Sequence, residues 1–441
     1  MKEHDIPEFL VPWQSVTHTN WTLDQAKYHY HIILGKMLQN TPQSLGDQEV
    51  PYLKAQHIQW EGVRIAELPM MWASPTEIET LRVKEGDLLV CEGGEVGRAA
   101  IATNALPMDC ILQNAIHLVR PKASGDTGYL RYLLRHAASQ QWLDVLCNKA
   151  TIAHFTVEKF SEMWAWFPPL ATQRAIATYL DRETAEIDAM IDAKGRLLGL
   201  LSEKRHALIA HAVTRGLDPA ALMRDSGVSW IGVVPEHWEI TNLKYVARIG
   251  NGSTPRRDYV FYWQDGTFPW LTSTVVNNEV IGEPTDFVTD FALRECHLPI
   301  VEPNSVLVAI TGEGKTRGKA AILPYKATIN QHMAYVTPIP MSQSIQTEFL
   351  QRYLSSSYEI LRMLSEGTGS TKGALTCEQL GEFPVVLPPI PEQQMIIEHV
   401  KMLTKRFDSL HDATQKSIEI LHERRAALIA AAVTGQINVV G

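Results

Sequence analysis

The chain has 441 residues, 45% of them hydrophobic and 20% charged, which predicts two to four globular units with sizeable cores. Its formal net charge of −9 excludes a uniformly basic surface, so positive charge for DNA binding would have to be local or come from partner chains. The first residues lack a secretion-signal pattern, and no apolar run reaches the roughly 18 residues of a membrane span. The 5 cysteines form no C-x-x-C pair, which favours a reducing cytoplasm over a disulfide framework or a cysteine metal site.

The first segment, residues 1–165, alternates short Val, Ile and Leu runs with Gly, Pro and Asn. This pattern is typical of short strands joined by turns, so we predict a mixed domain here. The segment contains a glycine-rich turn at residues 92–98 and an amide pair, Gln113 and Asn114.

Residues 166–216 are predicted to form one long helix. Pro168 and Pro169 precede its apolar pattern as helix breakers, and Gly216 with Pro219 suits its end. At 1.5 Å per residue the helix would be on the order of 60 Å long. The following stretch, residues 217–240, contains Pro and Gly and fits a linker.

A second mixed domain is predicted for residues 241–385, and a second long helix for residues 386–441. Within the domain, the runs at 305–310 and 320–323 are typical of strands. Pro391 suits the first position of the second long helix.

The two halves of the chain are similar to each other. Residues 167–173 align with 387–393, an offset of 387 − 167 = 220, and residues 201–214 align with 421–434 at the same offset. Further upstream the offset is 217, and there Gln113 and Asn114 align with Asn330 and Gln331. A duplication of this length predicts two similar domains, each followed by a long helix.

Both long helices carry a heptad pattern, with mainly apolar positions that step alternately by 4 and 3 residues. A long helix cannot bury its apolar stripe alone, so we expect the two helices to pack on each other as an antiparallel coiled coil. Packing of each helix on its own domain, or against another chain, is the alternative. The predicted fold class is α+β, with two similar mixed α/β domains joined by the two helices in a pseudo-two-fold tandem repeat. The residues assigned to helix pairing are Ile176, Leu180, Ile187, Leu201, Leu208, Ile396, Val400, Leu403, Phe407, Leu410, Leu421 and Leu428.

Stretches that imitate catalytic motifs fail at the residues that carry the chemistry. Residues 306–316 look like a strand running into a phosphate-binding loop, but Ala309 stands where the first glycine is required, and a strand pattern follows instead of a helix. The Pro-Pro pairs follow Phe167 and Leu387, not the Asn or Asp of an aminomethyltransferase motif. The histidines show no H-E-x-x-H pattern. We therefore predict that the chain has no catalytic centre, metal or cofactor of its own.

Several stretches resemble the specificity subunits of type I restriction-modification systems. They are residues 225–239, 252–255, 312–318, 367–371, 388–394 and 432–437. The likeness spans nearly the whole chain and occurs in both halves. The first half departs from the family pattern in two places. Residues 1 to about 50 lack a clean S-W-I-G-x-x-P or G-G-T-P copy, and Ala171-Thr172-Gln173 replaces P-E-Q.

The resemblance implies a division of labour between this chain and its partners. Each mixed domain would be a target recognition domain that reads one half of a split, asymmetric site on double-stranded DNA. The helices would set the spacing of the halves and dock two methyltransferase subunits, which two restriction subunits could join. S-adenosylmethionine, ATP and Mg²⁺ would then bind to partners that methylate adenine and cleave DNA. A coiled-coil scaffold without DNA specificity and a free-standing DNA-modifying enzyme are the alternatives.

The candidate DNA-binding residues are loop cations and amides of the two mixed domains. Cations would neutralise phosphates, and an arginine could also read guanine, while amides suit adenine edges. Each amide could equally stabilise a turn. In the second domain the candidates are Arg256, Arg257, Lys315, Arg317, Lys319, Asn330, Gln331, Thr371 and Lys372. In the first domain they are Arg98, Gln113, Asn114, Lys149 and Thr151.

Overall fold

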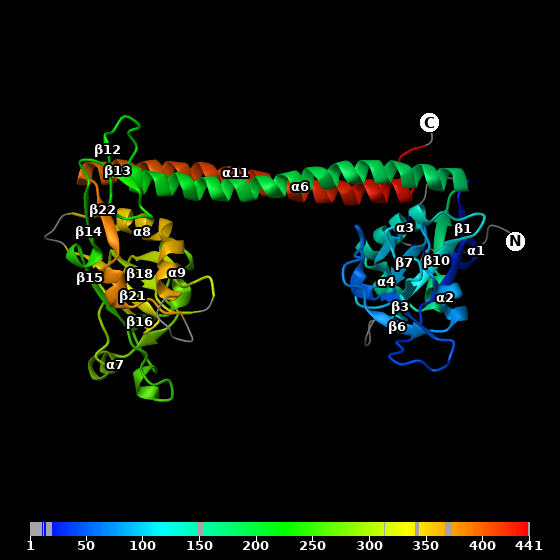
Figure 1. The fold of residues 1–441 in the computed structure, drawn as a ribbon, viewed down its shortest axis with the longest axis horizontal. Helices are drawn as coiled ribbons and strands as arrows, with labels where there is room; N and C mark the ends of the chain where they lie inside the picture. The colour runs from blue at the N-terminus through cyan, green and yellow to red at the C-terminus, as the bar shows by residue number, and fades with distance from the viewer. Residues whose placement is uncertain are drawn as a thin grey trace. The chain divides into compact units, whose positions relative to one another are not determined.

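The computed structural model describes residues 11, 13–14, 20–147, 154–312, 314–339, 344–366 and 373–439, which form two compact units (Figure 1). Unit 1 comprises Met1–Gly195 and Gln415–Gly441, and unit 2 comprises Arg196–Thr414. Each unit thus contains one mixed domain and one part of each long helix. No helix in the described ranges is long and apolar enough to cross a membrane.

The core of unit 1 is built around an antiparallel sheet of four strands in the order β2-β10-β7-β8. A second sheet has the order β6-β3-β9, and β1 pairs with β11 beside the start of the long helix. The strands are β1 (Thr22–Gln25), β2 (Tyr30–Leu34), β3 (Gln48–Leu53), β4 (Ile58–Gln59), β5 (Gly62–Val63), β6 (Met70–Ala73), β7 (Leu88–Cys91), β8 (Ala99–Ile101), β9 (Ile111–Leu112), β10 (Ile116–Pro121) and β11 (Trp164–Phe167). The helices are α1 (Ala26–His29), η2 (Ala55–His57), α2 (Pro75–Leu81), α3 (Thr127–Ser139), α4 (Trp142–Leu146) and α5 (Val157–Ser161).

Unit 2 repeats this plan. Its four-stranded sheet has the order β15-β21-β18-β19, its three-stranded sheet the order β17-β16-β20, and β14 pairs with β22. The strands are β12 (Met223–Asp225), β13 (Val233–Pro235), β14 (Glu239–Asn242), β15 (Ala247–Asn251), β16 (Phe268–Leu271), β17 (Phe287–Val288), β18 (Ser305–Ala309), β19 (Ala320–Leu323), β20 (Thr328–Ile329), β21 (Met333–Pro338) and β22 (Pro384–Leu387). The helices are η3 (Leu243–Tyr245), η4 (Val260–Tyr262), η5 (Ser273–Asn277), α7 (Asp290–Glu295), α8 (Thr347–Ser356), α9 (Tyr358–Glu366) and α10 (Cys377–Gly381).

The first domain has structural counterparts of the second domain's opening tryptophans, although its sequence departs from the family pattern there. Strands β14 and β15 follow β1 and β2 at an offset of 239 − 22 = 217. The same offset pairs Trp230 with Trp13 and Trp238 with Trp21. Trp13, Trp21 and Trp238 are buried, and Trp230 packs against the unit 2 core. An indole therefore fills the same place in both cores where the surrounding motif has changed.

The two long helices are α6 (Leu170–Arg215) and α11 (Ile390–Val433), which start directly after the Pro-Pro pairs. A buried glutamine fixes each start. The Gln173 amide donates to the carbonyl of Pro168 (2.8 Å) and accepts from the backbone N–H of Asp126 (3.0 Å). The Gln393 amide donates to the carbonyl of Pro388 (2.9 Å) and accepts from the backbone N–H of Gln346 (2.8 Å).

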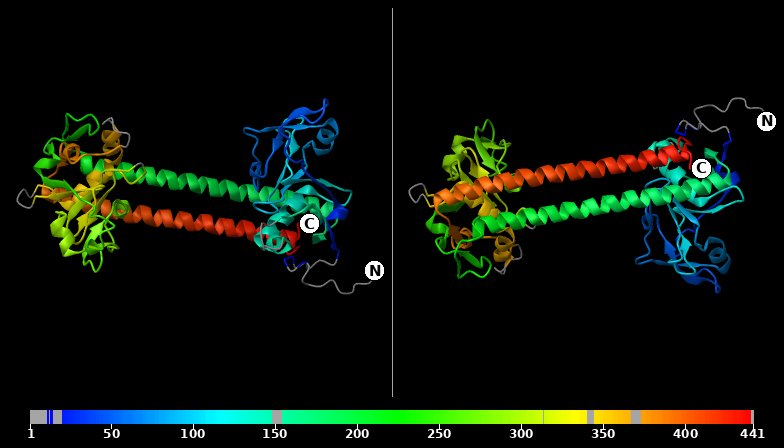
Figure 2. Two further views of the ribbon diagram at one scale, coloured as in Figure 1. Left: turned by 90° about the horizontal axis from the view of Figure 1, so that it is seen from below. Right: turned by 90° about the horizontal axis from the view of Figure 1, so that it is seen from above.

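The ends of the helices pack together inside the domain cores. In unit 1, Ile176 and Leu180 of α6 share a core with Ile429, Ala432 and Val433 of α11. In unit 2, Ala212 and Val213 of α6 share a core with Ile396, Ile397 and Val400 of α11. In both views of Figure 2, the red C-terminal end of α11 lies beside the domain that carries α3. The predicted packing of the helices on each other within one chain is therefore confirmed.

Two equivalent ion pairs show the antiparallel register of the helices. Asp188 pairs with Arg425 in unit 1 (2.9 Å), and Asp408 pairs with Arg205 in unit 2 (3.2 Å). The residue numbers of each pair add up to the same value, 188 + 425 = 205 + 408 = 613, so both units use one register. The offset of 220 relates Asp188 to Asp408 and Arg205 to Arg425.

The residues assigned to the heptad seam are not equally buried. Of the residues assigned to it, Ile176, Leu180, Ile187, Ile396, Val400 and Leu421 are buried, and Leu201, Leu403, Phe407 and Leu428 are half-buried. Leu208 and Leu410 are 37% and 45% exposed, so the helix pair leaves these two side chains partly open to solvent. The neighbouring Ile209 packs against the unit 2 core instead.

Replacing Gln393 with leucine should destabilise unit 2 by about 3 kcal/mol. The substitution leaves the backbone N–H of Gln346 and two carbonyls without their partners, and each such loss costs roughly 1–3 kcal/mol. Denaturant unfolding would measure the effect. Gln394→Leu is the matched control, because that exposed side chain bonds only within its own helix. Equal stabilities of the two variants would contradict the role assigned to Gln393.

Candidate nucleic-acid interface

Three loops that the sequence singled out meet at one edge of the unit 2 sheets. They follow the C-terminal ends of β15, β18 and β20. A chain of side-chain hydrogen bonds joins them, in which Thr254 donates to Gln331, Gln331 contacts His332 (3.3 Å), and His332 contacts Thr311 (2.6 Å). Gln331 and His332 are exposed. The edge therefore presents polar groups that can both donate and accept hydrogen bonds.

His332 is a member of this cluster that sequence reasoning missed. Its position next to the amide pair Asn330 and Gln331 was the available signal. Asn330 itself is buried, and its side-chain oxygen accepts the backbone N–H of His332 (3.1 Å). The turn-stabilising alternative therefore holds for Asn330, whereas Gln331 stays available on the surface.

A glycine at the end of the edge strand allows the loops to approach. A Cβ atom on Gly252 would lie 1.7 Å from the carbonyl oxygen of Ile329, a distance that no side chain can accept. Gly35, 217 residues earlier, has the same relation to Leu112, whose carbonyl oxygen would lie 2.6 Å from an added Cβ atom. In unit 1 the backbone of Asn114 bonds to Lys36 (2.9 Å) beside this contact. Both domains thus place the strand-end glycine against the residue that directly precedes the amide pair, which is Gln113 and Asn114 in unit 1 and Asn330 and Gln331 in unit 2.

Arg257 is held on the faces of two tryptophans in unit 2. Its guanidinium lies 4.0 Å from the ring centroid of Trp263 and 4.5 Å from that of Trp270. The two indole N–H groups donate to the carbonyls of Arg256 (2.9 Å) and Ser253 (3.1 Å), which fixes the loop that carries Arg257. The Arg257 side chain is still 54% exposed. This arrangement presents a positioned cation to solvent.

The neighbouring Arg256 is held much less firmly. Its side chain is 77% exposed and pairs with the equally open Asp258 (2.8 Å). An exposed pair of this kind contributes little to stability and can exchange its partner. Next to it, Tyr259, Val260 and Phe261 expose apolar surface around η4.

The cations of the second glycine-rich turn differ in their availability. Lys315 is exposed, and the half-buried Lys319 donates to Asn277 (2.9 Å). Arg317 is only 5% exposed and pairs with Glu366 (3.1 Å), which contradicts its predicted role as a surface contact for DNA. The reason is that the turn folds back on α9, whose last residue is Glu366.

The matching turn of unit 1 also directs its arginine inward. Arg98 pairs with Glu95 (2.9 Å) and donates to the carbonyl of Ala55 (2.9 Å) in η2, so it ties the turn to the domain. Gln113 and Asn114 are half-buried. The remaining candidates, Lys149, Thr151, Thr371 and Lys372, lie outside the described residues.

Comparisons with known proteins agree across sequence and structure. Residues 48–194 and 235–420, well over half of the chain, match the model of the type I restriction modification DNA specificity domain. The type I restriction enzyme MjaIX specificity subunit of Methanocaldococcus jannaschii is 22% identical over 80% of this chain and 78% of its own length. The EcoKI specificity subunit of Escherichia coli strain K12 is 19% identical over 89% of this chain and 84% of its own.

Two solved structures share the fold. A chain from a structure of a type I R-M system, described in terms of its complex assembly and conformational transition, matches with a TM-score of 0.72, 15% identity and coverage of 95% of this chain and 99% of that one. The HsdS subunit of Thermoanaerobacter tengcongensis matches with a TM-score of 0.56, 17% identity and coverage of 95% and 98%. The chain, with its two tandem matches to the family model, belongs to the type I restriction-modification specificity subunits.

Proposed function

We propose that this chain reads a bipartite, asymmetric site on double-stranded DNA, with one half-site for each mixed domain. The observation that carries the proposal is the repeated loop edge, where in both units a strand-end glycine packs on the residue that precedes an amide pair. The frame is the same, but the side chains on it differ between the domains. Two different half-sites are the expected consequence.

Exposed and half-buried side chains on the loops of unit 2 suit the two kinds of DNA contact. Arg256, Lys315 and Lys319 are proposed to neutralise phosphates, which positions the protein without selecting sequence. Arg257 is proposed to read a guanine, because a guanidinium can donate two parallel hydrogen bonds to the O6 and N7 atoms. Gln331 and Thr254 would contact neighbouring base edges.

The net charge of −9 is compatible with this function because only the loop edges need to be positive. We further propose that the chain is non-catalytic and acts in the cytoplasm. Two methyltransferase subunits would dock on it and flip and methylate adenine, and restriction subunits would add ATP-dependent cleavage. S-adenosylmethionine, ATP and Mg²⁺ are then bound by those partners.

A gel shift with the methyltransferase partner on duplexes of different sequence tests the proposal. We expect sequence-specific binding that weakens with salt, and methyl transfer only when the partner is present. A scaffold without a DNA role would show no sequence preference. A free-standing enzyme would transfer methyl groups alone.

The long helices are proposed to set the spacing between the half-sites. Removing residues 191–197 and 411–417 together takes one heptad from each helix but keeps both Asp-Arg pairs. The helices shorten by roughly 10 Å, so the preferred spacer should shorten by about 3 base pairs. Selection from duplexes with randomised spacers measures this, and an unchanged spacer would refute the ruler function.

A further inference from the structure

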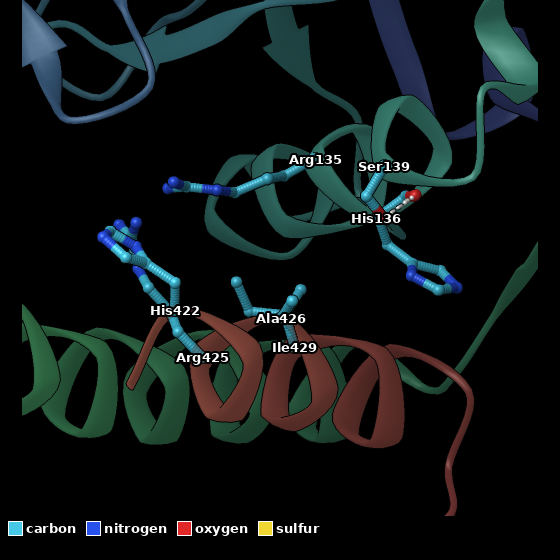
Figure 3. A pocket seen from close by; sticks show the side chains of 7 residues that line it. All are labelled: Arg135, His136, Ser139, His422, Arg425, Ala426 and Ile429. Atoms are coloured by element: carbon cyan, nitrogen blue, oxygen red, sulfur yellow. Dashed lines mark hydrogen bonds between the residues drawn. The ribbon is translucent and has the colours of Figure 1, made fainter. Parts of the chain in front are cut away.

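Unit 1 contains a basic cavity on the side of α11 that faces α3. The cavity has a volume of about 160 Å³ and is lined by Arg135, His136, Ser139, His422, Arg425, Ala426 and Ile429. Figure 3 shows the charged ends of Arg135 and Arg425 and the imidazole of His422 gathered at one end, while the imidazole of His136 points the other way. None of these residues belongs to the loop edge proposed to read DNA.

The two arginines of this cavity have separate carboxylate partners. Arg425 pairs with Asp188 (2.9 Å), yet its buried Nε has no hydrogen-bond partner within the described part of the chain. Arg135 lies 3.6 Å from the well-exposed carboxylate of Glu61 and over the ring of Trp60. Burial lowers the pKa of Arg135, and the nearby charge of Arg425 lowers it further. Each guanidinium thus has a carboxylate partner of its own, but no ion pair among the described residues bridges the two.

In unit 2 a carboxylate of the chain itself lies between the two corresponding arginines. Arg205 corresponds to Arg425, since 425 − 220 = 205. Arg352 of α8 lies on the same helix face as Arg135 but one turn earlier, since 352 − 220 = 132. Glu279, which follows η5 as Glu61 follows η2, forms ion pairs with both Arg205 (3.4 Å) and Arg352. One anionic group therefore bridges the two arginines in unit 2.

We propose that the unit 1 cavity is a binding site for a free tetrahedral oxyanion such as phosphate. The anion would bridge Arg135 and Arg425 as the carboxylate of Glu279 bridges their counterparts. Charge-assisted hydrogen bonds from two guanidinium groups are the strong kind. A volume of about 160 Å³ leaves room for a phosphate ion.

His422 supports the assignment to an anion. It lines the cavity in unit 1, whereas the equivalent position of unit 2, already served by Glu279, is Ser202. A bound oxyanion would link α3 to α11 and so hold the C-terminal helix end on the first domain. Anion binding at this site would not require that the chain reads DNA.

The site can be tested by measuring amide hydrogen exchange of the full chain, once in phosphate and once in chloride at equal ionic strength. When phosphate is at ten times its Kd, exchange by opening of the segments at 127–139 and 415–433 should slow by roughly tenfold, and more phosphate should slow it further in proportion. The unit 2 segments at 347–356 and 196–215 are the internal reference for general salt effects. They should not respond.

Arg135→Gln should abolish the response, and Arg352→Gln is the matched control that should leave it unchanged. His422→Ser alters an exposed side chain and should weaken the phosphate response without unfolding the chain. Glu279→Gln should make the unit 2 segments responsive. An equal response to chloride, or an undiminished response in both Arg135→Gln and His422→Ser, would overturn the proposal.

Discussion

Replacing Arg257 with alanine should weaken binding to duplexes that carry the preferred second half-site by about 5- to 150-fold. The physical reason is that one bidentate contact to guanine discriminates by roughly 1–3 kcal/mol. Arg257 is suited to such a contact because Trp263 and Trp270 hold its guanidinium while leaving it partly exposed. The loss should appear as relaxed preference at one base pair when duplexes varied in the second half-site compete for the complex.

Two neighbouring variants serve as controls for Arg257→Ala. Arg257→Lys keeps the charge but removes the paired donors, so it should lose nearly as much discrimination. Arg256→Ala should instead weaken all sequences alike and reduce the salt slope by about 1, as expected for a phosphate contact. If Arg256→Ala changed the sequence preference and Arg257→Ala did not, the two roles would have to be exchanged. Loss of methyltransferase assembly would show that the loop does not face DNA.

Gly252→Ala should nearly abolish recognition of the second half-site, with a loss of a hundredfold or more. The added Cβ would lie 1.7 Å from a backbone carbonyl oxygen, so β15 and the amide turn must move apart. The loops relieve the overlap by moving apart, and returning them to the DNA-reading arrangement would cost about 3 kcal/mol, which lowers the affinity by roughly two decades. Binding to duplexes altered in one half-site at a time would measure it, because the first half-site should still be read.

Gly282→Ala is the matched control for Gly252→Ala. A Cβ atom at Gly282 meets nothing within 4 Å, so this variant should bind like the original chain. Gly35→Ala should produce the mirror result, a defect confined to the first half-site. Normal binding by Gly252→Ala would mean that the glycine contact does not shape the DNA-reading edge.

The duplication, the two long helices and the mixed domains were predictable because each leaves a pattern along the chain. An offset of 220 and a heptad period are visible without any contact information, and the observed α6 and α11 lie inside the predicted helical ranges. The same local information could not show that Leu208 and Leu410 stay exposed. Their burial depends on what covers the helix pair from the outside.

For the candidate DNA-binding residues, too, the sequence could not show which side chains are exposed. Arg257 and Arg317 were equal candidates in the sequence, since both follow turn residues in the second domain. The structure separates them, because Glu366 lies beside Arg317 and buries its charge, whereas Trp263 supports Arg257 at the surface. His332 went unnoticed because nothing in its sequence neighbourhood reveals that Thr311 lies next to it.

By itself, the sequence determined the family, the tandem repeat and the position of the long helices, since these follow from residue spacing and resemblance. Tertiary structure decided which charges are free, which glycines are indispensable, and that the end of α11 completes the core of the first domain. It also decided that Glu279 bridges two arginines in unit 2 while Arg135 and Arg425 border a cavity in unit 1. The physical reason is that each of these properties depends on groups far apart in the chain, whose meeting is fixed only by the packing of the whole unit.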